Sequence, residues 1–128
     1  MIYKKTILII DDMKHIRDIL WFSLKQEGYR PILAENGQRG LDCLFDKENR
    51  VDLVILDVMM PKMDGFQVLE KIRTSNDPAS KTPVIMLTAK AQKEAVIKGL
   101  SMGASDYVLK PYKFTELLSK VQNLIGKG

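Results

Sequence analysis

Five short apolar runs recur along the chain, and each is long enough to form one strand. They occupy residues 7–10, 31–34, 53–56, 84–87 and 107–109. Within each run the apolar residues are continuous instead of alternating with polar ones, which is typical of strands that are covered on both faces. Such strands indicate a largely parallel sheet with helices packed on both sides.

The segments between these runs have the spacing of amphipathic helices. The clearest is the last, in which six apolar residues form one stripe: Phe114, Leu117, Leu118, Val121, Leu124 and Ile125. A similar stripe between residues 13 and 28 contains Met13, Ile16, Leu20 and Leu24. Gly28 and Gly103 are predicted helix ends, and Asn36 is a predicted helix start. The pattern is therefore a strand followed by a helix, repeated five times.

This alternation predicts an α/β fold in which right-handed crossovers join parallel strands. The 128 residues fit one domain, covering 1–128. In open sheets of this kind, ligands bind at the carboxyl ends of the strands, near the point where the strand order reverses. Function should therefore be sought at that edge of the sheet.

Composition excludes several classes of protein. The chain is 45% hydrophobic, but no window reaches the roughly 18 apolar residues that a membrane span needs, and no signal peptide is visible. A cytoplasmic location is therefore expected. The single cysteine, Cys43, cannot form an internal disulfide, and no Cys/His cluster has a metal-ligand spacing. The net charge is +4, but the basic residues are scattered, so nucleic-acid binding is not expected.

Polar residues follow four of the five apolar runs. Asp11 and Asp12 follow the first run, Asp57 the third, Thr88 the fourth and Lys110 the fifth. If strands one and three are neighbours, as in the order 2-1-3-4-5, three carboxylates converge. Two unit charges about 4 Å apart repel by roughly 4 kcal/mol at an effective dielectric constant near 20. A Mg²⁺ ion, which prefers oxygen ligands, would relieve that repulsion.

These groups together are the parts needed for phosphoryl transfer, in which Asp57 itself can be the nucleophile. Each has an ordinary interpretation when taken alone. Asp11 and Asp12 could cap a helix, Thr88 could be a simple strand residue, and Lys110 could be a solvated lysine. Their common place at the ends of successive strands favours the functional interpretation.

Five stretches of the sequence resemble the receiver domain of two-component response regulators. They read ILIIDD, LAENG, VILDVMMPKMDG, PVIMLTA and GASDYVLKPY. The resemblance implies a doubly wound (βα)5, flavodoxin-like sandwich with a five-stranded parallel sheet in the order 2-1-3-4-5. It further implies that Asp57 is the phosphoacceptor and that Asp11, Asp12, Asp57 and the Met59 backbone carbonyl bind Mg²⁺.

The same resemblance gives roles to the fourth and fifth strands. Thr88 would bind a phosphoryl oxygen, and Lys110 would pair with the phosphoryl group. The Lys110–Pro111 bond would be cis, and Tyr107 would be an aromatic switch that rotates inward when Thr88 moves. The face expected to change on phosphorylation is formed by the fourth helix, fifth strand and fifth helix, at residues 90–103, 105–109 and 113–125.

The partners implied are a sensor histidine kinase or a histidine phosphotransfer domain as phosphoryl donor, and a downstream protein target. Small acyl phosphates could replace the donor. The chain would not be an enzyme beyond its own phosphorylation and dephosphorylation, and it would be a monomer or a phosphorylation-dependent dimer, without membrane binding. In the first helix, Ile16, Arg17, Trp21 and Phe22 are candidates for docking the donor, although a wider buried stripe would explain them equally well.

Two alternatives and one hypothesis remain open. The chain could be the receiver part of a larger DNA-binding regulator or a metal-dependent phosphohydrolase. The latter needs a second acid two residues after its nucleophile, where Met59 stands. We further hypothesise that the bulky side chains of Met59 and Lys90, each two residues after a site residue, slow hydrolysis of the phosphoryl group.

Overall fold

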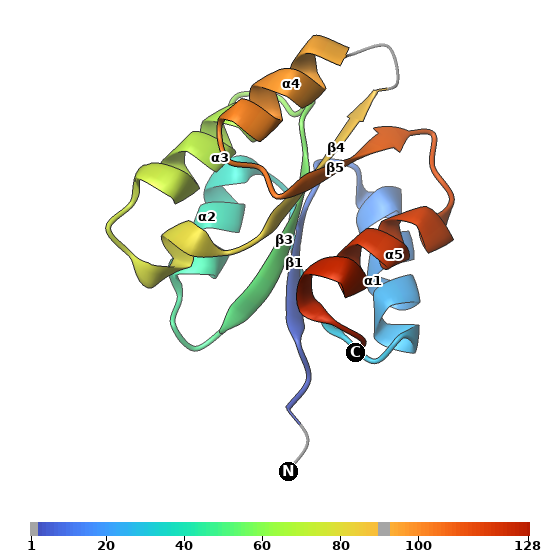
Figure 1. The fold of residues 1–128 in the computed structure, drawn as a ribbon. Helices are drawn as coiled ribbons and strands as arrows, with labels where there is room; N and C mark the ends of the chain where they lie inside the picture. Colours follow the sequence, from blue (N-terminus) through green and yellow to red (C-terminus); the bar gives the residue numbers. More distant parts are fainter. Residues whose placement is uncertain (1–2, 90–92) are drawn as a thin grey trace.

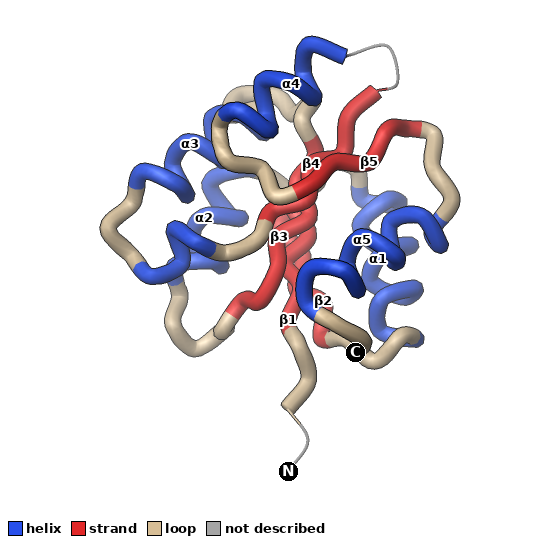
Figure 2. Tube along the Cα trace, in the orientation of Figure 1, coloured by secondary structure: helices blue, strands red, loops and turns tan. Residues whose placement is uncertain are grey.

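The computed structural model describes residues 3–89 and 93–128, and it has a five-stranded parallel sheet between two layers of helices (Figures 1 and 2). The strand order is β2-β1-β3-β4-β5, and every neighbouring pair is parallel. The predicted flavodoxin-like fold is therefore confirmed. The elements are β1 (Thr6–Ile10), α1 (Lys14–Gln26), β2 (Arg30–Ala34), α2 (Gly37–Phe45), β3 (Val51–Asp57), α3 (Gly65–Thr74), the 3₁₀ helix η1 (Pro78–Lys81), β4 (Val84–Ala89), α4 (Lys93–Ser101), β5 (Asp106–Lys110) and α5 (Phe114–Ile125).

Each strand of the sheet sends alternate side chains to opposite layers. In β1, Leu8 and Ile10 pack into the core on the side of α2 and α3, whereas Ile7 and Ile9 pack against α1 and α5. Figure 1 shows α2, α3 and α4 on one side of the sheet and α1 and α5 on the other. Because both faces are covered, the continuous apolar runs of the sequence are explained. No helix in the described residues is long and apolar enough to cross a membrane.

Three strands, β3, β4 and β5, extend further at their carboxyl ends than the apolar runs predicted. Asp57 is the last residue of β3, Thr88 lies within β4, and Lys110 is the last residue of β5, so these residues end strands instead of following them. The reason is that pairing continues past the apolar run: Asp57 pairs with Leu87, and Thr88 pairs with Leu109. The site residues are thus held by the hydrogen-bonded ladder itself.

The helix boundaries follow the predicted signals with one correction. The Asn36 side chain accepts a hydrogen bond from the Arg39 amide and caps α2, as predicted. Gly28 and Gly103 follow the ends of α1 and α4 with φ of +91° and +100°. The predicted helical stripe included Met13, which instead precedes α1 and is 47% exposed. The predicted output segment begins at Lys90, which lies outside the described residues.

Gly65, at the start of α3, allows this helix to approach the strand that carries Asp57. A Cβ atom at Gly65 would lie 2.6 Å from the Asp57 carbonyl oxygen and 2.8 Å from the Cα of Val58. The Gly65 amide also donates a 2.9 Å hydrogen bond to the Val58 carbonyl. Because the nearest atoms belong to backbone, they cannot rotate away from a larger side chain.

The substitution Gly65→Ala is therefore expected to lower the free energy of unfolding by about 1–3 kcal/mol, the usual range for overpacking. Urea denaturation followed by circular dichroism measures this change. Glu70→Ala is the matched control, because Glu70 is exposed on the same helix; its effect should stay within about 0.5 kcal/mol. Equal losses in the two variants would contradict the close approach.

Candidate functional site

Three carboxylates meet at the carboxyl ends of β1 and β3. Asp57 ends β3, and Asp11 and Asp12 directly follow β1. Each can offer one oxygen such that the three oxygens lie within 4.8 Å of one another. Asp11 and Asp57 are buried, at 1% and 3% exposure, while Asp12 is exposed. The predicted convergence of these acids is therefore present in the structure.

An ammonium group reaches this cluster from β5, two strands away from β3. Lys110 Nζ donates a 2.9 Å hydrogen bond to Asp57 Oδ1, and the Lys110 side chain is 35% exposed. The peptide bond between Lys110 and Pro111 is cis. One further cation lies close by, since Arg17 Nη1 donates a 2.8 Å hydrogen bond to the Asp11 carbonyl. The site thus combines a buried acid, a paired lysine and two neighbouring acids.

Two buried polar oxygens at the site have no hydrogen-bond partner in the described part of the chain. They are Asp11 Oδ2 and Thr88 Oγ1. Leaving such an atom buried and unpaired costs about 1–3 kcal/mol, so most are satisfied in native proteins. Hard oxygen donors in a carboxylate cluster suit Mg²⁺. The residues present therefore fit a divalent cation beside Asp11 and an additional acceptor group beside Thr88.

Burial dominates the electrostatics of both inner acids. Burial raises the pKa of the Asp57 carboxyl above its ordinary value, while the hydrogen bond and the charge of Lys110 act against that rise. Burial also raises the pKa of Asp11; a hydrogen bond from the Met13 amide opposes this, and the charge of Asp57 adds to it. Both carboxylates would be stabilised by additional positive charge.

Thr88 and Tyr107 lie along the same narrow gap beneath α4. The gap is bounded on the sheet side by Val58 and Met86 and on the helix side by Val96 and Gly99, and it leaves no room for a water molecule. Tyr107 is half-buried. The predicted switch pair therefore faces a common space, although the switching role itself stays a prediction.

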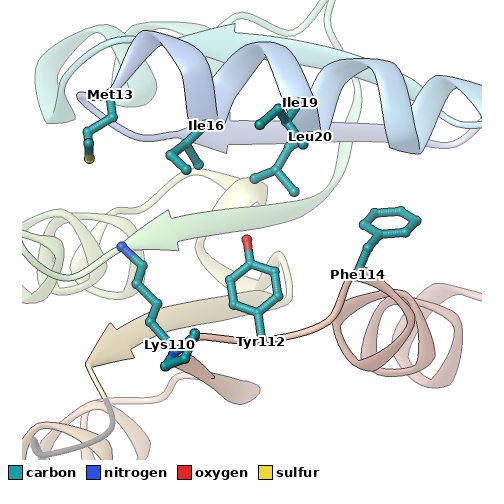
Figure 3. Close-up of a pocket in the computed structure, with 8 residues that line it drawn as sticks. Met13, Ile16, Ile19, Leu20, Lys110, Tyr112 and Phe114 are labelled. Carbon is teal, nitrogen blue, oxygen red and sulfur yellow. The ribbon is translucent and has the colours of Figure 1, made fainter.

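An apolar groove of about 400 Å³ opens beside Lys110, between α1 and the segment that links β5 to α5 (Figure 3). Its lining combines residues from both sides: Met13, Ile16, Ile19, Leu20, Lys110, Pro111, Tyr112 and Phe114. Figure 3 shows the Tyr112 hydroxyl pointing toward α1. Burial raises the pKa of Tyr112, and the charges of Asp11 and Asp57 raise it further.

Sequence reasoning did not single out Tyr112 as a site residue. The available signal was its position two residues after Lys110, which places its ring beside the carboxyl end of β5. A helical projection of α1 alone could not reveal the groove, because half of its lining comes from the end of β5 and the chain segment that follows it.

The four residues proposed for docking divide between two surfaces. Ile16 lines the groove, and Arg17 donates a hydrogen bond to the backbone carbonyl of Asp11. Trp21 and Phe22 instead border a separate hollow of about 330 Å³ toward the end of α1, where Lys25 Nζ lies 4.5 Å from the centre of the Trp21 ring. Phe22 is 60% exposed. Their docking role remains a prediction.

Comparison with known proteins gives consistent matches over nearly the whole chain. The profile of the family described as response regulator receiver domain matches residues 7–122. The chemotaxis protein CheY4 of Vibrio cholerae is similar in structure, with a TM-score of 0.86 and 30% identity over 96% of this chain and 100% of that chain.

Two further solved structures are similar to the same degree. A putative response regulator from Chloroflexus aurantiacus gives a TM-score of 0.85 and 32% identity, over 95% of this chain and 98% of that one. The signal receiver domain of a signal transduction histidine kinase from Syntrophus aciditrophicus gives a TM-score of 0.83 and 33% identity, over 94% of this chain and 89% of that one. The likeness therefore extends to receiver domains in different protein settings.

The raised pKa of Asp11 has a consequence for stability. A group whose pKa is higher in the folded state makes folding less favourable as pH rises through that pKa. In EDTA-containing buffer at pH 7, Asp11→Asn should therefore be more stable than wild type by about 1–3 kcal/mol, because it removes a buried, partly unpaired charge while retaining the oxygen that bonds the Met13 amide. Urea titrations at several pH values measure the difference.

The difference should shrink as pH falls toward the ordinary aspartate pKa of 3.8, because the raised pKa of Asp11 favours proton uptake by the folded wild type over this range. Asp46→Asn is the control, because Asp46 is an exposed aspartate at the end of α2. A stability gain in Asp11→Asn that does not depend on pH would contradict the electrostatic explanation.

Proposed function

Since the chain belongs to the response regulator receiver domain family, we propose that it is a phosphoacceptor switch of a two-component system or phosphorelay, with Asp57 as the acceptor. Receiver domains are signalling switches and not classical enzymes. The observation that carries the proposal is a buried carboxylate at the end of a central strand, bonded to Lys110 and flanked by Asp11 and Asp12. A purely structural ion pair does not explain two further acids at the same point.

Asp11, Asp12 and Asp57, together with the Met59 backbone carbonyl, are the groups proposed to hold Mg²⁺. When bound, the ion would neutralise negative charge on the carboxylates and on the phosphoryl group. Three carboxylates within reach of one another support this assignment, as does the Asp11 oxygen that has no partner among residues 3–89 and 93–128. The chain thus supplies oxygen ligands of the kind this ion prefers.

In the proposed transfer, an Asp57 carboxylate oxygen forms a bond to phosphorus while the phosphorus–nitrogen bond of a phosphohistidine breaks and the imidazole leaves. Lys110 already holds Asp57 in position and would pair with a phosphoryl oxygen. The Thr88 hydroxyl, which lacks a partner among the described residues, would donate to another. The rigid ends of β3, β4 and β5 supply the positioning on which such reactions depend.

Output would follow from the movement of Thr88 toward the phosphoryl group. Phosphorylation adds close to two negative charges and three acceptor oxygens, which biases an equilibrium between two conformations. Tyr107 would move with Thr88, and the surface of α4, β5 and α5 would change. This surface carries Ile97 and Leu100, at 68% and 45% exposure, as candidate contacts for a downstream protein or for a second phosphorylated copy.

The donor would be a sensor histidine kinase or a histidine phosphotransfer domain, with a small acyl phosphate as a possible substitute. The groove beside Lys110 supports an approach across α1, where Ile16 and Arg17 lie next to the acidic cluster. Trp21 and Phe22 would extend the contact along the helix. Neither nucleic acid nor membrane is part of this proposal, which assigns the protein to the cytoplasm.

The test is to incubate the protein with Mg²⁺ and acetyl phosphate and to measure the added phosphoryl mass by intact mass spectrometry. Wild type should gain one phosphoryl group, and Asp57→Asn should gain none. Asp46→Asn, at the opposite end of the sheet, should behave as wild type. Phosphoryl mass retained in Asp57→Asn, or a wild-type gain that is unaffected by EDTA, would overturn the proposal.

Met59 is predicted to affect how long the phosphoryl group persists. Its side chain is 65% exposed two residues after Asp57, where it would shield the phosphoryl group from water. Met59→Asn should shorten the phosphoryl lifetime several-fold, because an amide can orient an attacking water molecule. Lifetimes are measured by mass spectrometry after removal of acetyl phosphate. The same measurement can be made on the double variant Met59→Asn with Lys90→Glu, although Lys90 lies outside the described residues. Equal lifetimes would end this hypothesis.

A further inference from the structure

An ion pair between Lys120 and Asp106 joins α5 to β5 next to Tyr107. Lys120 Nζ, on α5, lies 3.1 Å from Asp106 Oδ1 on β5, and both side chains are 30% exposed. The same Asp106 oxygen accepts a 2.8 Å hydrogen bond from the Tyr107 backbone amide. Lys120 Nζ also lies 5.4 Å from the centre of the Tyr107 ring. One ammonium group therefore contacts both the ring of Tyr107 and the carboxylate that holds its backbone.

Tyr107 occupies the boundary between this ion pair and the gap beneath α4. Its side chain lines the gap together with Thr88, whose buried hydroxyl is unpartnered in the described part of the chain. The gap is too small even for a water molecule, so movement of the ring further into it would require α4 to shift away from the sheet. Such a movement would separate the ring from Lys120, because Lys120 belongs to α5 and the gap is closed by α4. The Tyr107 ring therefore lies between two environments, the Lys120–Asp106 ion pair on one side and the gap beneath α4 on the other.

We infer that Lys120 and Asp106 form a latch that holds Tyr107 in its resting position and opposes the phosphorylation-linked rearrangement. This inference rests on the proposed function, because it takes Tyr107 as part of the switch. Lys120 is a positioning residue here: it touches neither the acidic cluster nor a phosphoryl group and acts through Tyr107. The latch sets how far the equilibrium lies toward the resting state before phosphorylation.

The contacts of the latch are weak enough to be overcome and strong enough to measure. A partly exposed cation–π contact and a partly exposed ion pair are each modest, so their joint loss should shift the equilibrium by about three- to tenfold. A ligand that stabilises the switched state would then bind more tightly by the same factor, since binding and conformation are linked. A carboxylate of a partner protein that paired with Lys120 would release the latch in the same way.

The test compares wild type, Lys120→Met and Lys120→Arg by titration with beryllium fluoride and Mg²⁺, a mimic of the phosphoryl group. Nuclear magnetic resonance of ¹³C-labelled tyrosine rings follows Tyr107. Lys120→Met should bind the mimic about three- to tenfold more tightly, and its unliganded Tyr107 signal should move toward the liganded position. Lys120→Arg should keep the affinity for the mimic within about twofold of wild type, because arginine keeps the charge and stacks on aromatic rings.

Lys71→Met is the matched control, because Lys71 is an exposed lysine in the last turn of α3, away from Tyr107; it should match wild type. Unchanged or weaker binding in Lys120→Met, or a Tyr107 signal that moves away from the liganded position, would overturn the latch. Failure of wild type itself to bind the mimic would instead overturn the proposed phosphoacceptor function. The two failures are therefore distinguishable.

Discussion

The contact between Lys110 and the buried carboxylate of Asp57 is the interaction on which the rest of the site depends. Burial works against the charged form of Asp57, and the ammonium group 2.9 Å away works in its favour. The two residues belong to strands that are separated in the sheet by β4. The pair can form only when three strands are correctly assembled, so the chemistry of the site is a product of the whole fold.

Much of the fold could be predicted from the sequence because its strongest signals are local. Continuous apolar runs mark strands covered on both faces, and Asn36, Gly28 and Gly103 mark helix boundaries through their own backbone preferences. The strand ends could not be predicted, because they depend on pairing with neighbouring strands: Asp57 stays in β3 through its pairing with Leu87. Met13 gives a second example, because its spacing fits the apolar stripe of the helix although the helix begins only at Lys14.

The site divides in a similar way between predictable and unpredictable parts. Parallel strands bring their carboxyl ends to one edge, so the order of elements placed Asp11, Asp12, Asp57 and Lys110 at the same edge of the sheet. Their convergence depended in addition on the strand order 2-1-3-4-5, which the family resemblance implied. Contacts that depend on how helices pack over the sheet could not be predicted. The groove between α1 and Tyr112 is of this kind, as is the approach of a lysine on α5 to an aromatic ring on β5.

In the proposed switch, the resting state would respond to a ligand through two buried oxygens that lack hydrogen-bond partners among the described residues. They are Thr88 Oγ1 and Asp11 Oδ2. The proposed phosphoryl group would satisfy the first, and the proposed cation would satisfy the second. A ligand can shift an equilibrium only by its differential affinity for the two states. A hydrogen bond from the Thr88 hydroxyl to the phosphoryl group would favour the switched state, whereas the contact of Lys120 with the Tyr107 ring would favour the resting state. Together the two contacts would provide such a difference. The balance between these two opposing contacts would then determine how sharply the surface of α4, β5 and α5 responds to events at Asp57.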